Sequence, residues 1–316
     1  MTVPTGGGGT IRGGNQSGRL CRVEIGGPIP GETLTGLSAL SPASFDTPPR
    51  QKLIVQAPQN ALRIRFKGSW QVDNWVYSNA SVEIWGLSPE HQEFVANKNA
   101  PVALYTGWDN GQPLIPTLIF PAYHVSTTHD GPDFITKLEG GDGGRAAQEA
   151  RTNKSHAPGV NIFDVAKGLL GMRGKMGANS LATLQAAAGN RKLNGGYVSV
   201  GKATRQVKGL MDELGLDMTV WLGNVVLTPK NGTTGSRFLL TPDSGLVGSP
   251  GPAGAPQPQL PQQWKTKILL NPLIGPGSQV QVQADALNGA FRCQTVDHHG
   301  DTYDTDWYTD LTLRRI

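Results

Sequence analysis

The sequence predicts a mainly β protein with a small α/β insert, and three observations lead to this fold class. Short runs that alternate apolar and polar residues occur towards both ends of the 316-residue chain, and such period-two runs are typical of half-buried strands. Apolar residues recur at helical spacing mainly in the middle of the chain. Glycine (42 residues) and proline (23 residues) make up about a fifth of the sequence, which favours many short strands joined by turns.

The first part of the chain predicts a flexible arm followed by a strand-rich domain. Residues 1–18 are Gly-rich and polar, with too few apolar side chains to offset the entropy of ordering. Residues 19–131 carry about six strand-like runs, such as ALRIRFKG. One short helix is expected in SPEHQEFVANK, where Ser88 suits the N-cap and Pro89 the first helical position. These elements predict a small, barrel-like antiparallel domain.

The middle of the chain, residues 159–235, predicts an α/β module. Apolar residues stand at helical spacing in NIFDVAKGLLGMRGKM and again in ANSLATLQAAAG. A further helix in ATRQVKGLMDELG is expected to end at Gly215. A hairpin should follow it, with its turn near Leu222, Gly223 and Asn224.

The rest of the chain returns to strand patterns. QVQVQA alternates valine with glutamine, and the residues from Leu287 to Ala290 are expected to form a turn. The stretch GSPGPAGAPQPQLPQQ predicts a surface loop, and we expect residues 249–263 to be mobile in an isolated subunit. Cys21 and Cys293 lie in strand-like runs, where a free cysteine usually behaves as a small buried hydrophobe.

The composition disfavours two classes of protein. Charged residues make up 16% of the chain and the net charge is +4, so no face is obviously built to hold nucleic acid. The first residues contain no apolar run of the kind that signal peptides carry. No later stretch approaches the roughly 20 apolar residues of a membrane-spanning helix. We therefore expect a soluble protein, made in the cytoplasm and without stable membrane insertion.

Two stretches resemble the baseplate hub proteins of tailed phages. The first runs from NASVEIWGLSPEHQEFVANK through PVALYTGW and TLIFPAYHV to DFITKLEGGDG, in the order that the first domain of the hubs has. The second contains LTPDSGLVGSP and then WKTKILLNPLIGPGSQVQVQADALNGAFRCQTVDHHGDTYDTDW, and it is similar to the end of the same family. Together the two matches cover about two thirds of the chain in the family's order.

The resemblance implies two tail-tube-like antiparallel β-barrels with the α/β module inserted between parts of the second. Residues 19–131 would form the first barrel, and residues 132–158 with residues 236–316 would form the second, discontinuous one. Hubs of this family are trimers, so three chains with two barrels each give a ring of six. A three-to-six adaptor of this kind needs two similar domains in every chain.

The function implied by the resemblance is structural. A homotrimeric hub joins the hexameric tail tube, or a distal tube protein, to the trimeric central spike, and its lumen lets the genome pass. Wedge proteins of the baseplate and the tape measure protein are further implied partners, and DNA is expected only in transit. The implied place is the virion tail, assembled in the host cytoplasm. The host, and whether the tail contracts, stay open.

The stretch DHHGDTYDTDWYTDL, residues 297–311, is the strongest candidate for a chemical site. His298 and His299 are neighbours, so on a strand they point to opposite faces and cannot readily bind one metal. His298 could still join Asp301 in a tight loop, but the other histidines stand in unrelated segments. We favour a strand that ends at Val296 and a hairpin connection that begins at His299-Gly300-Asp301, with Gly300 in the strained position and Trp307 packed at the start of the last strand.

The other candidate sites have simpler structural interpretations. GGGG and GGDGG lack the Lys-Ser/Thr of a phosphate loop. Asp212 and Glu213 are neighbours on a predicted helix and diverge by about 100°, so they do not flank one bond as glycosidase carboxylates do. Arg63, Arg65 and Lys67 share one face of a strand, which is more typical of a solvated or subunit-facing strand than of a nucleic-acid patch.

We therefore predict a protein that is not an enzyme and that has no catalytic residues, cofactor or metal. The alternative is a tail protein that degrades the cell wall or binds carbohydrate. Seven tryptophans keep the binding alternative open, although most tryptophans lie in cores and interfaces.

Overall fold

The computed structural model describes residues 18–26, 52–57, 62–72, 78–96, 100–143, 149–254 and 261–316. Of the predicted arm, only Gly18 is among them, and residues 255–260 of the predicted loop also lie outside the described residues. None of the helices in these ranges is long and apolar enough to cross a membrane.

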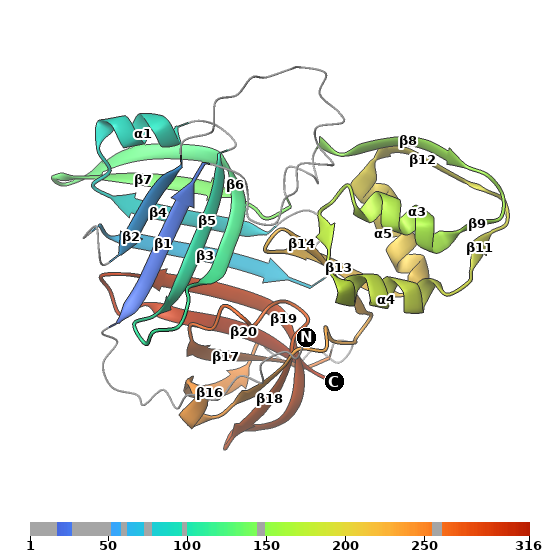
Figure 1. The fold of residues 1–316 in the computed structure, drawn as a ribbon. Helices are drawn as coiled ribbons and strands as arrows, with labels where there is room; N and C mark the ends of the chain where they lie inside the picture. Colours follow the sequence, from blue (N-terminus) through green and yellow to red (C-terminus); the bar gives the residue numbers. More distant parts are fainter. Residues whose placement is uncertain are drawn as a thin grey trace.

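A sheet of thirteen strands dominates the fold, which is mainly β as predicted (Figure 1). Its main path runs β16-β17-β20-β19-β3-β4-β7-β6-β5-β1-β2, with β18 beside β19 and β15 beside β18. Only the pairing of β15 with β18 is parallel in this sheet. The strands are β1 Arg19–Ile25, β2 Leu53–Ala57, β3 Ile64–Gln71, β4 Asn79–Trp85, β5 Pro101–Trp108, β6 Ile115–Asp130, β7 Asp133–Gly140, β15 Arg237–Leu240, β16 Leu246–Pro252, β17 Gln263–Leu269, β18 Gln279–Ala284, β19 Leu287–Asp301 and β20 Trp307–Arg315.

The two expected barrels are joined in this sheet, and the described strands form no closed barrel. β3 pairs with the end of β19, from Gln71 opposite Thr295 to Arg65 opposite Asp301. The path ends at β2 and β16 instead of closing on itself. Backbone N–H and C=O groups of buried strands need partners, and β3 and β19 supply them to each other where the strands of the two expected barrels meet.

The strands that were expected to open the second barrel have other neighbours. β7 is hydrogen-bonded between β4 and β6, in the first half of the sheet, which consists of β1–β7, whereas β15–β20 make up the second half. β8 (Arg151–His156) pairs with β12 (Tyr197–Lys202) in the α/β unit. A period-two pattern identifies a strand without identifying its neighbours, because register and pairing depend on the rest of the fold.

Three apolar cores lie in three successive parts of the molecule. One lies among β1–β7, where it includes Phe66 and Phe120, and it also takes in Leu270 and Trp307 from the later part of the chain. A second lies among β15–β20 and includes Phe291 and Val296. The third belongs to the α/β unit. Both cysteines are buried in the two sheet cores, as predicted.

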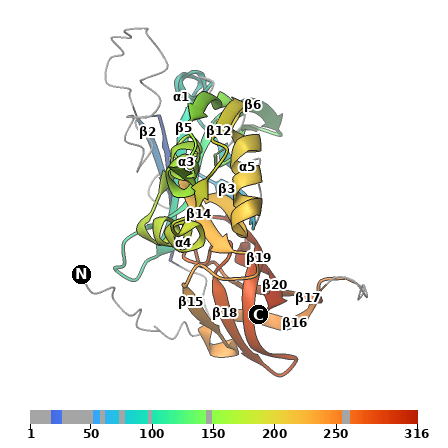
Figure 2. The same cartoon turned by 90° about the vertical axis from the view of Figure 1, so that its right-hand side faces the viewer.

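The middle of the chain forms the predicted α/β unit, and Figure 2 shows its helices in front of the sheet. α5 ends at Gly215, which has a left-handed φ of 67°. Leu222 and Gly223 both have positive φ in the β13–β14 turn, as a tight hairpin requires. Besides β8 and β12, the elements of the α/β unit are β9 Val160–Asn161, α3 Ile162–Leu170, β10 Lys175–Met176, α4 Ala178–Ala188, β11 Lys192–Leu193, α5 Ala203–Leu214, β13 Leu216–Trp221 and β14 Asn224–Pro229.

Three local predictions can be compared with the structure. The early helix is confirmed as α1 (Pro89–Val95), where the Ser88 hydroxyl accepts a hydrogen bond from the His91 N–H. The predicted turn at residues 287–290 is wrong, because Leu287 already pairs with Ala284 and opens β19. The predicted loop at residues 249–263 is partly wrong, because β16 continues to Pro252 across a bulge. Prolines are tolerated at such bulges.

Candidate functional site

One face of the sheet carries polar side chains across both halves, from β17, β20 and β19 to β3, β4 and β7. On β3, Arg65 and Lys67 are exposed while Ile64 and Phe66 are buried, so the solvent side of the alternation was predicted correctly. Cross-strand pairing aligns three rows, which are Lys267-Asp310-Asp297-Ser69, Tyr308-His299-Lys67-Ser81-Glu139 and Arg65-Glu83-Lys137.

Charges of both signs alternate on this polar face. Lys137 lies 2.8 Å from Glu139 and 3.8 Å from Glu83, and Arg65 lies 3.6 Å from Glu83. Exposed pairs of this kind contribute little stability. Together these pairs make the surface polar and leave it without a strong electrostatic field of one sign. Neither an apolar chain nor a polyanion would adhere strongly to such a surface.

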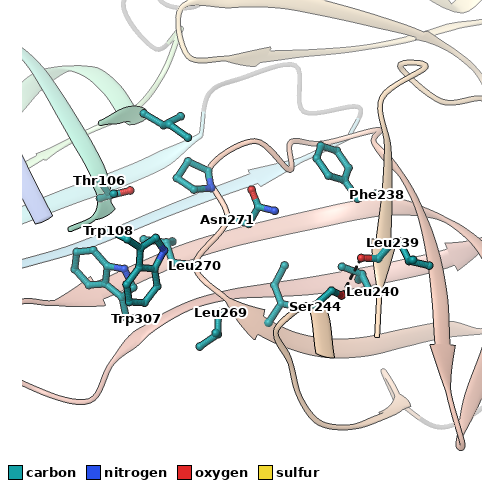
Figure 3. Close-up of a pocket in the computed structure, with 14 residues that line it drawn as sticks. Thr106, Trp108, Phe238, Leu239, Leu240, Ser244, Leu269, Leu270, Asn271 and Trp307 are labelled. Carbon is teal, nitrogen blue, oxygen red and sulfur yellow. Dashed lines mark hydrogen bonds between the residues drawn. The ribbon is translucent and has the colours of Figure 1, made fainter. Parts of the chain in front are cut away.

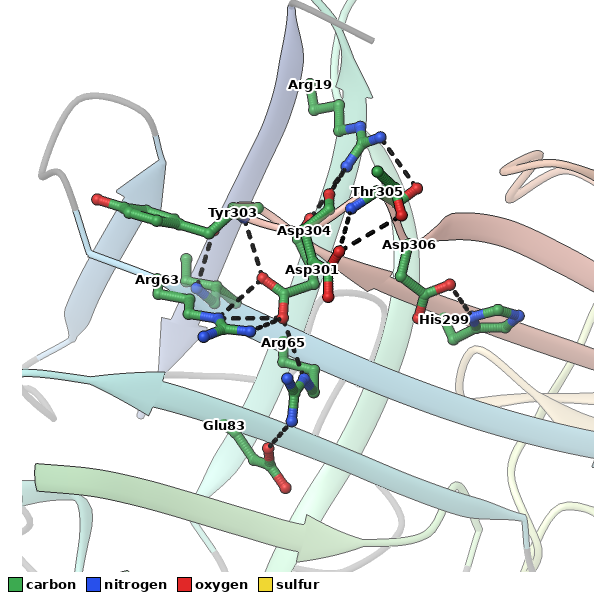
Figure 4. A network of polar contacts seen from close by, with 12 residues as sticks. Arg19, Arg63, Arg65, Glu83, His299, Asp301, Tyr303, Asp304, Thr305 and Asp306 are labelled. Carbon is green, nitrogen blue, oxygen red and sulfur yellow. Dashed lines mark hydrogen bonds and ion pairs between the residues drawn. The ribbon is translucent and has the colours of Figure 1, made fainter. Parts of the chain in front are cut away.

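A buried carboxylate lies where the two halves of the sheet meet (Figure 4). Asp301 is 1% exposed and accepts hydrogen bonds from Arg63 (Nη2, 2.7 Å) and from Arg65 (Nε, 3.0 Å). Burial alone would raise the pKa of this carboxyl. Hydrogen bonds from Arg63, the Tyr303 N–H and Arg65 outweigh burial and hold the pKa below its ordinary value. Asp301 is therefore a charged structural tie between β19 and β3.

A third arginine fixes the connection that follows Asp301. Arg19 of β1 donates hydrogen bonds to the backbone carbonyls of Asp301 (3.2 Å), Asp304 and Thr305 (3.1 Å). Its guanidinium carbon lies 5.5 Å from the centre of the Trp307 ring. Trp307 is fully buried at the start of β20, as predicted. The predicted start of the connection is wrong, because the strand does not end at Val296 but continues as β19 to Asp301.

The adjacent histidines point to opposite faces of β19, as predicted. His298 is fully buried, and its Nδ1 lies 2.9 Å from the Thr309 hydroxyl. Burial, with a smaller effect of His299, lowers the pKa of His298 to about 3. His299 lies on the polar face, between Asp306 (2.7 Å) and Asp310 (3.1 Å). Hydrogen bonding to Asp310, and then to Asp306, raises the pKa of His299.

These side chains do not converge on one point. His298 contacts the core, His299 contacts the carboxylates of two aspartates, one before β20 and one in it, and Asp301 binds arginines. Within the described ranges no group of three His, Cys, Asp or Glu side chains is arranged to hold a metal.

The remaining candidates have separate structural partners. Asp212 pairs with Lys230 at 3.1 Å, and Glu213 pairs with Arg191 at 2.8 Å. The GGGG run lies outside the described residues. In GGDGG, the buried Asp142 accepts a hydrogen bond from the Gly223 N–H at 3.0 Å. That bond joins the first half of the sheet to the tip of the β13–β14 hairpin.

The sequence did not predict a second contact that joins the sheet to the α/β insert. Arg292 of β19 is 2% exposed and donates to Asp217 (2.8 Å) and to the Thr228 hydroxyl (2.7 Å). The signal was a lone arginine in the apolar run AFRCQTV and a lone aspartate in LDMTV. A charge in a run of this kind needs a buried partner, but the sequence does not say which.

A pocket of about 260 Å³ opens between the two halves of the sheet (Figure 3). Thr106, Trp108 and Ile115 of the β5–β6 hairpin form one side, and Phe238 and the residues around Leu270 form the other. The lining is mainly apolar and contains no Asp, Glu, His, Lys or Arg. The pocket lining therefore supplies no ionisable side chain.

Comparison with known proteins places the fold among phage tail proteins. No protein-family model and no curated protein matches the sequence. The 43 kDa tail protein of prophage MuSo2 from Shewanella oneidensis aligns with a TM-score of 0.57 and 9% identity, over 83% of this chain and 94% of its own.

Secretion proteins share the fold as well. An Escherichia coli component of the type VI secretion system, reported as structurally similar to the T4 tail proteins gp27 and gp5, gives a TM-score of 0.52 at 12% identity over 80% of this chain and 73% of its own. A chain of the Francisella PdpA–VgrG complex gives 0.55 at 8% identity, over 97% of this chain and 59% of its own. The resemblance to baseplate hubs is thus confirmed at the level of fold, and this chain has the fold of these phage tail and secretion proteins.

Proposed function

We propose that this protein is a structural hub of a phage tail, a trimer that joins the tail tube to the central spike and encloses the lumen. The observation that carries the proposal is the fold, which aligns with a prophage tail protein over 83% of this chain and 94% of that protein. The proposed place is the virion tail, after assembly in the host cytoplasm. The wedge proteins of the baseplate and the tape measure protein are further proposed partners. DNA would contact the hub only while it passes through the lumen.

The two halves of the sheet are the proposed tube-like units. Strands β1–β7 form one, around a core to which Leu270 and Trp307 also contribute, and strands β15–β20 form the other around a second core. The α/β unit, from β8 to β14, is inserted between them. The polar face that crosses both halves is the proposed lumen wall, because its mixed charges would let DNA pass without holding it.

The proposed role is not enzymatic. His299, Asp301 and Asp310 of the 297–311 stretch form ion pairs between strands, and the pocket has no ionisable lining. Immunogold labelling of intact tails with an antibody to this chain tests the proposal. Label at the distal end of the tube supports a hub. Label along the tube, or cell-wall hydrolysis by the purified protein, contradicts it.

A further inference from the structure

The pocket between the two halves of the sheet has an apolar lining that reaches the surface. Figure 3 shows Trp108 and Trp307 at one end of it and Phe238 and Leu239 at the other. Leu239 is 53% exposed, so the apolar lining continues to the mouth of the pocket. Concave apolar surfaces of this kind often mark binding sites. Because the lining has no ionisable side chain, the pocket suits an uncharged, apolar occupant.

The pocket also lies beside a strand that has only one neighbour. Phe238, Leu239 and Leu240 of β15 all belong to the lining. Successive side chains of a strand point to opposite faces, so a pocket that meets all three lies at the edge of β15. Among the described strands, β15 is hydrogen-bonded only to β18. An edge of this kind can accept a further strand, and extended segments commonly bind proteins in this way.

The arm that precedes β1 is attached at the rim of this pocket. The carbonyl oxygen of Gly18 accepts a hydrogen bond from the Asp109 N–H at 2.6 Å, and Arg19 is directly opposite Trp108 of the lining. The first large apolar residue before Gly18 is Ile11. Seven residues span at most about 23 Å when fully extended, so Ile11 is within reach of a pocket whose rim begins at Trp108.

We propose that the segment Thr10-Ile11-Arg12 binds this pocket in its own chain, with the Ile11 side chain in the apolar lining and its backbone along β15. Period two then turns Thr10 and Arg12 away from the pocket, which agrees with a lining without charge. Bound in this way, the segment links the β5–β6 hairpin of the first half of the sheet to β15 of the second. It replaces the expectation of a flexible arm for these three residues alone.

The covalent attachment at Gly18 makes a weak contact sufficient. A short linker holds a segment near its site at an effective concentration in the mM range. One buried isoleucine with a few backbone hydrogen bonds therefore needs a dissociation constant of only about 1 mM to occupy the pocket for half of the time or more. The same contact made by a separate chain at μM concentration would leave the pocket almost empty. This difference favours the arm of the same chain over a second copy or another protein.

Disulfide trapping in the full chain tests the contact. The native Cys21 and Cys293 are fully buried and should not exchange with introduced thiols. In a glutathione buffer, Ile11→Cys with Leu239→Cys should form an intramolecular disulfide with an equilibrium constant at least about tenfold above that of the control. The matched control is Ile11→Cys with Tyr303→Cys, because Tyr303 is 66% exposed and lies in the connection that β1 holds through its first residue.

A second measurement avoids introduced cysteines. Ile11→Asp should raise the fluorescence of an apolar dye added to the full chain severalfold, because the pocket is then open to the dye. Ile11→Leu should keep the wild-type signal, since it preserves the apolar side chain. Val3→Asp is the control for an added charge elsewhere in the arm and should also leave the signal unchanged.

Three results would overturn this contact, and each leaves the hub proposal standing. The first is equal trapping of Ile11→Cys by the cysteines at positions 239 and 303, which would show proximity without binding. The second is equal dye fluorescence of the wild type and Ile11→Asp, which would leave the pocket to a segment of another protein. The third is a disulfide that links two chains instead of closing within one, which would assign the pocket to the arm of a second copy.

Discussion

Arg292 donates a hydrogen bond to Asp217 over 2.8 Å, and this buried pair ties β19 of the sheet to β13 of the insert. The two residues are 75 positions apart in the sequence. At the turn of the β13–β14 hairpin, Asp142 of the first half of the sheet accepts a hydrogen bond from the Gly223 N–H. The insert is therefore tied to both halves of the sheet and can help to fix their relative orientation.

Removing one partner of this pair should be costly. Arg292→Ala leaves Asp217 buried without its arginine, and we expect the free energy of unfolding to fall by about 3–5 kcal/mol. The double variant Arg292→Met with Asp217→Leu should lose less than the single one, because it leaves no unpaired charge. Urea denaturation of both variants measures this, and equal losses would contradict the account.

Asp301→Asn should destabilise the junction between the halves by about 2–3 kcal/mol, because Arg63 and Arg65 lose a shared carboxylate. The pKa of Asp301 is lowered by folding, so its contribution is present above the unfolded pKa of about 3.9 and is lost as pH falls through the folded value. The difference between wild type and variant should shrink from pH 6 to pH 3. A constant difference in denaturation midpoint would show that charge is not the cause.

His299 should contribute stability with the opposite pH dependence. Its pKa is raised by folding, so the contribution is complete below the unfolded pKa of about 6.5 and is lost as pH rises through the folded value. NMR titration of the ring should give a pKa above 6.5 that falls in Asp310→Asn. His298, with a pKa of about 3, is the internal control and should not titrate between pH 5 and pH 9. A His299 pKa that Asp310→Asn leaves unchanged would exclude this cause.

Two glycines should respond in opposite directions to alanine. A Cβ at Gly140 would lie 2.1 Å from the backbone oxygen of Pro121, so β6 and β7 would have to separate at a cost of about 2–3 kcal/mol. A Cβ at Gly168 in α3 meets nothing within 4 Å, so Gly168→Ala should stabilise the helix by about 0.5–1 kcal/mol. Thermal unfolding of the two variants compares them, and a Gly140→Ala protein as stable as wild type would contradict the close approach of these strands.

Local patterns predicted the elements of this fold better than their neighbours. The helix caps at Ser88 and Gly215 and the alternation around Phe66 depend on residues close in sequence, and the structure has them as expected. The partners of β7 and β8 depend on contacts between distant segments, which periodicity does not encode. The same limit applies to Arg292, whose run shows that a partner is needed but does not identify Asp217.

The most direct test of the hub proposal is the mass and symmetry of the purified full chain in solution. Native mass spectrometry, combined with class averages from electron microscopy, should show a species of three times 33.6 kDa with three-fold symmetry around a central channel. A two-fold dimer, or a trimer without an axial channel, would contradict the central claim that this chain forms the hub of a phage tail.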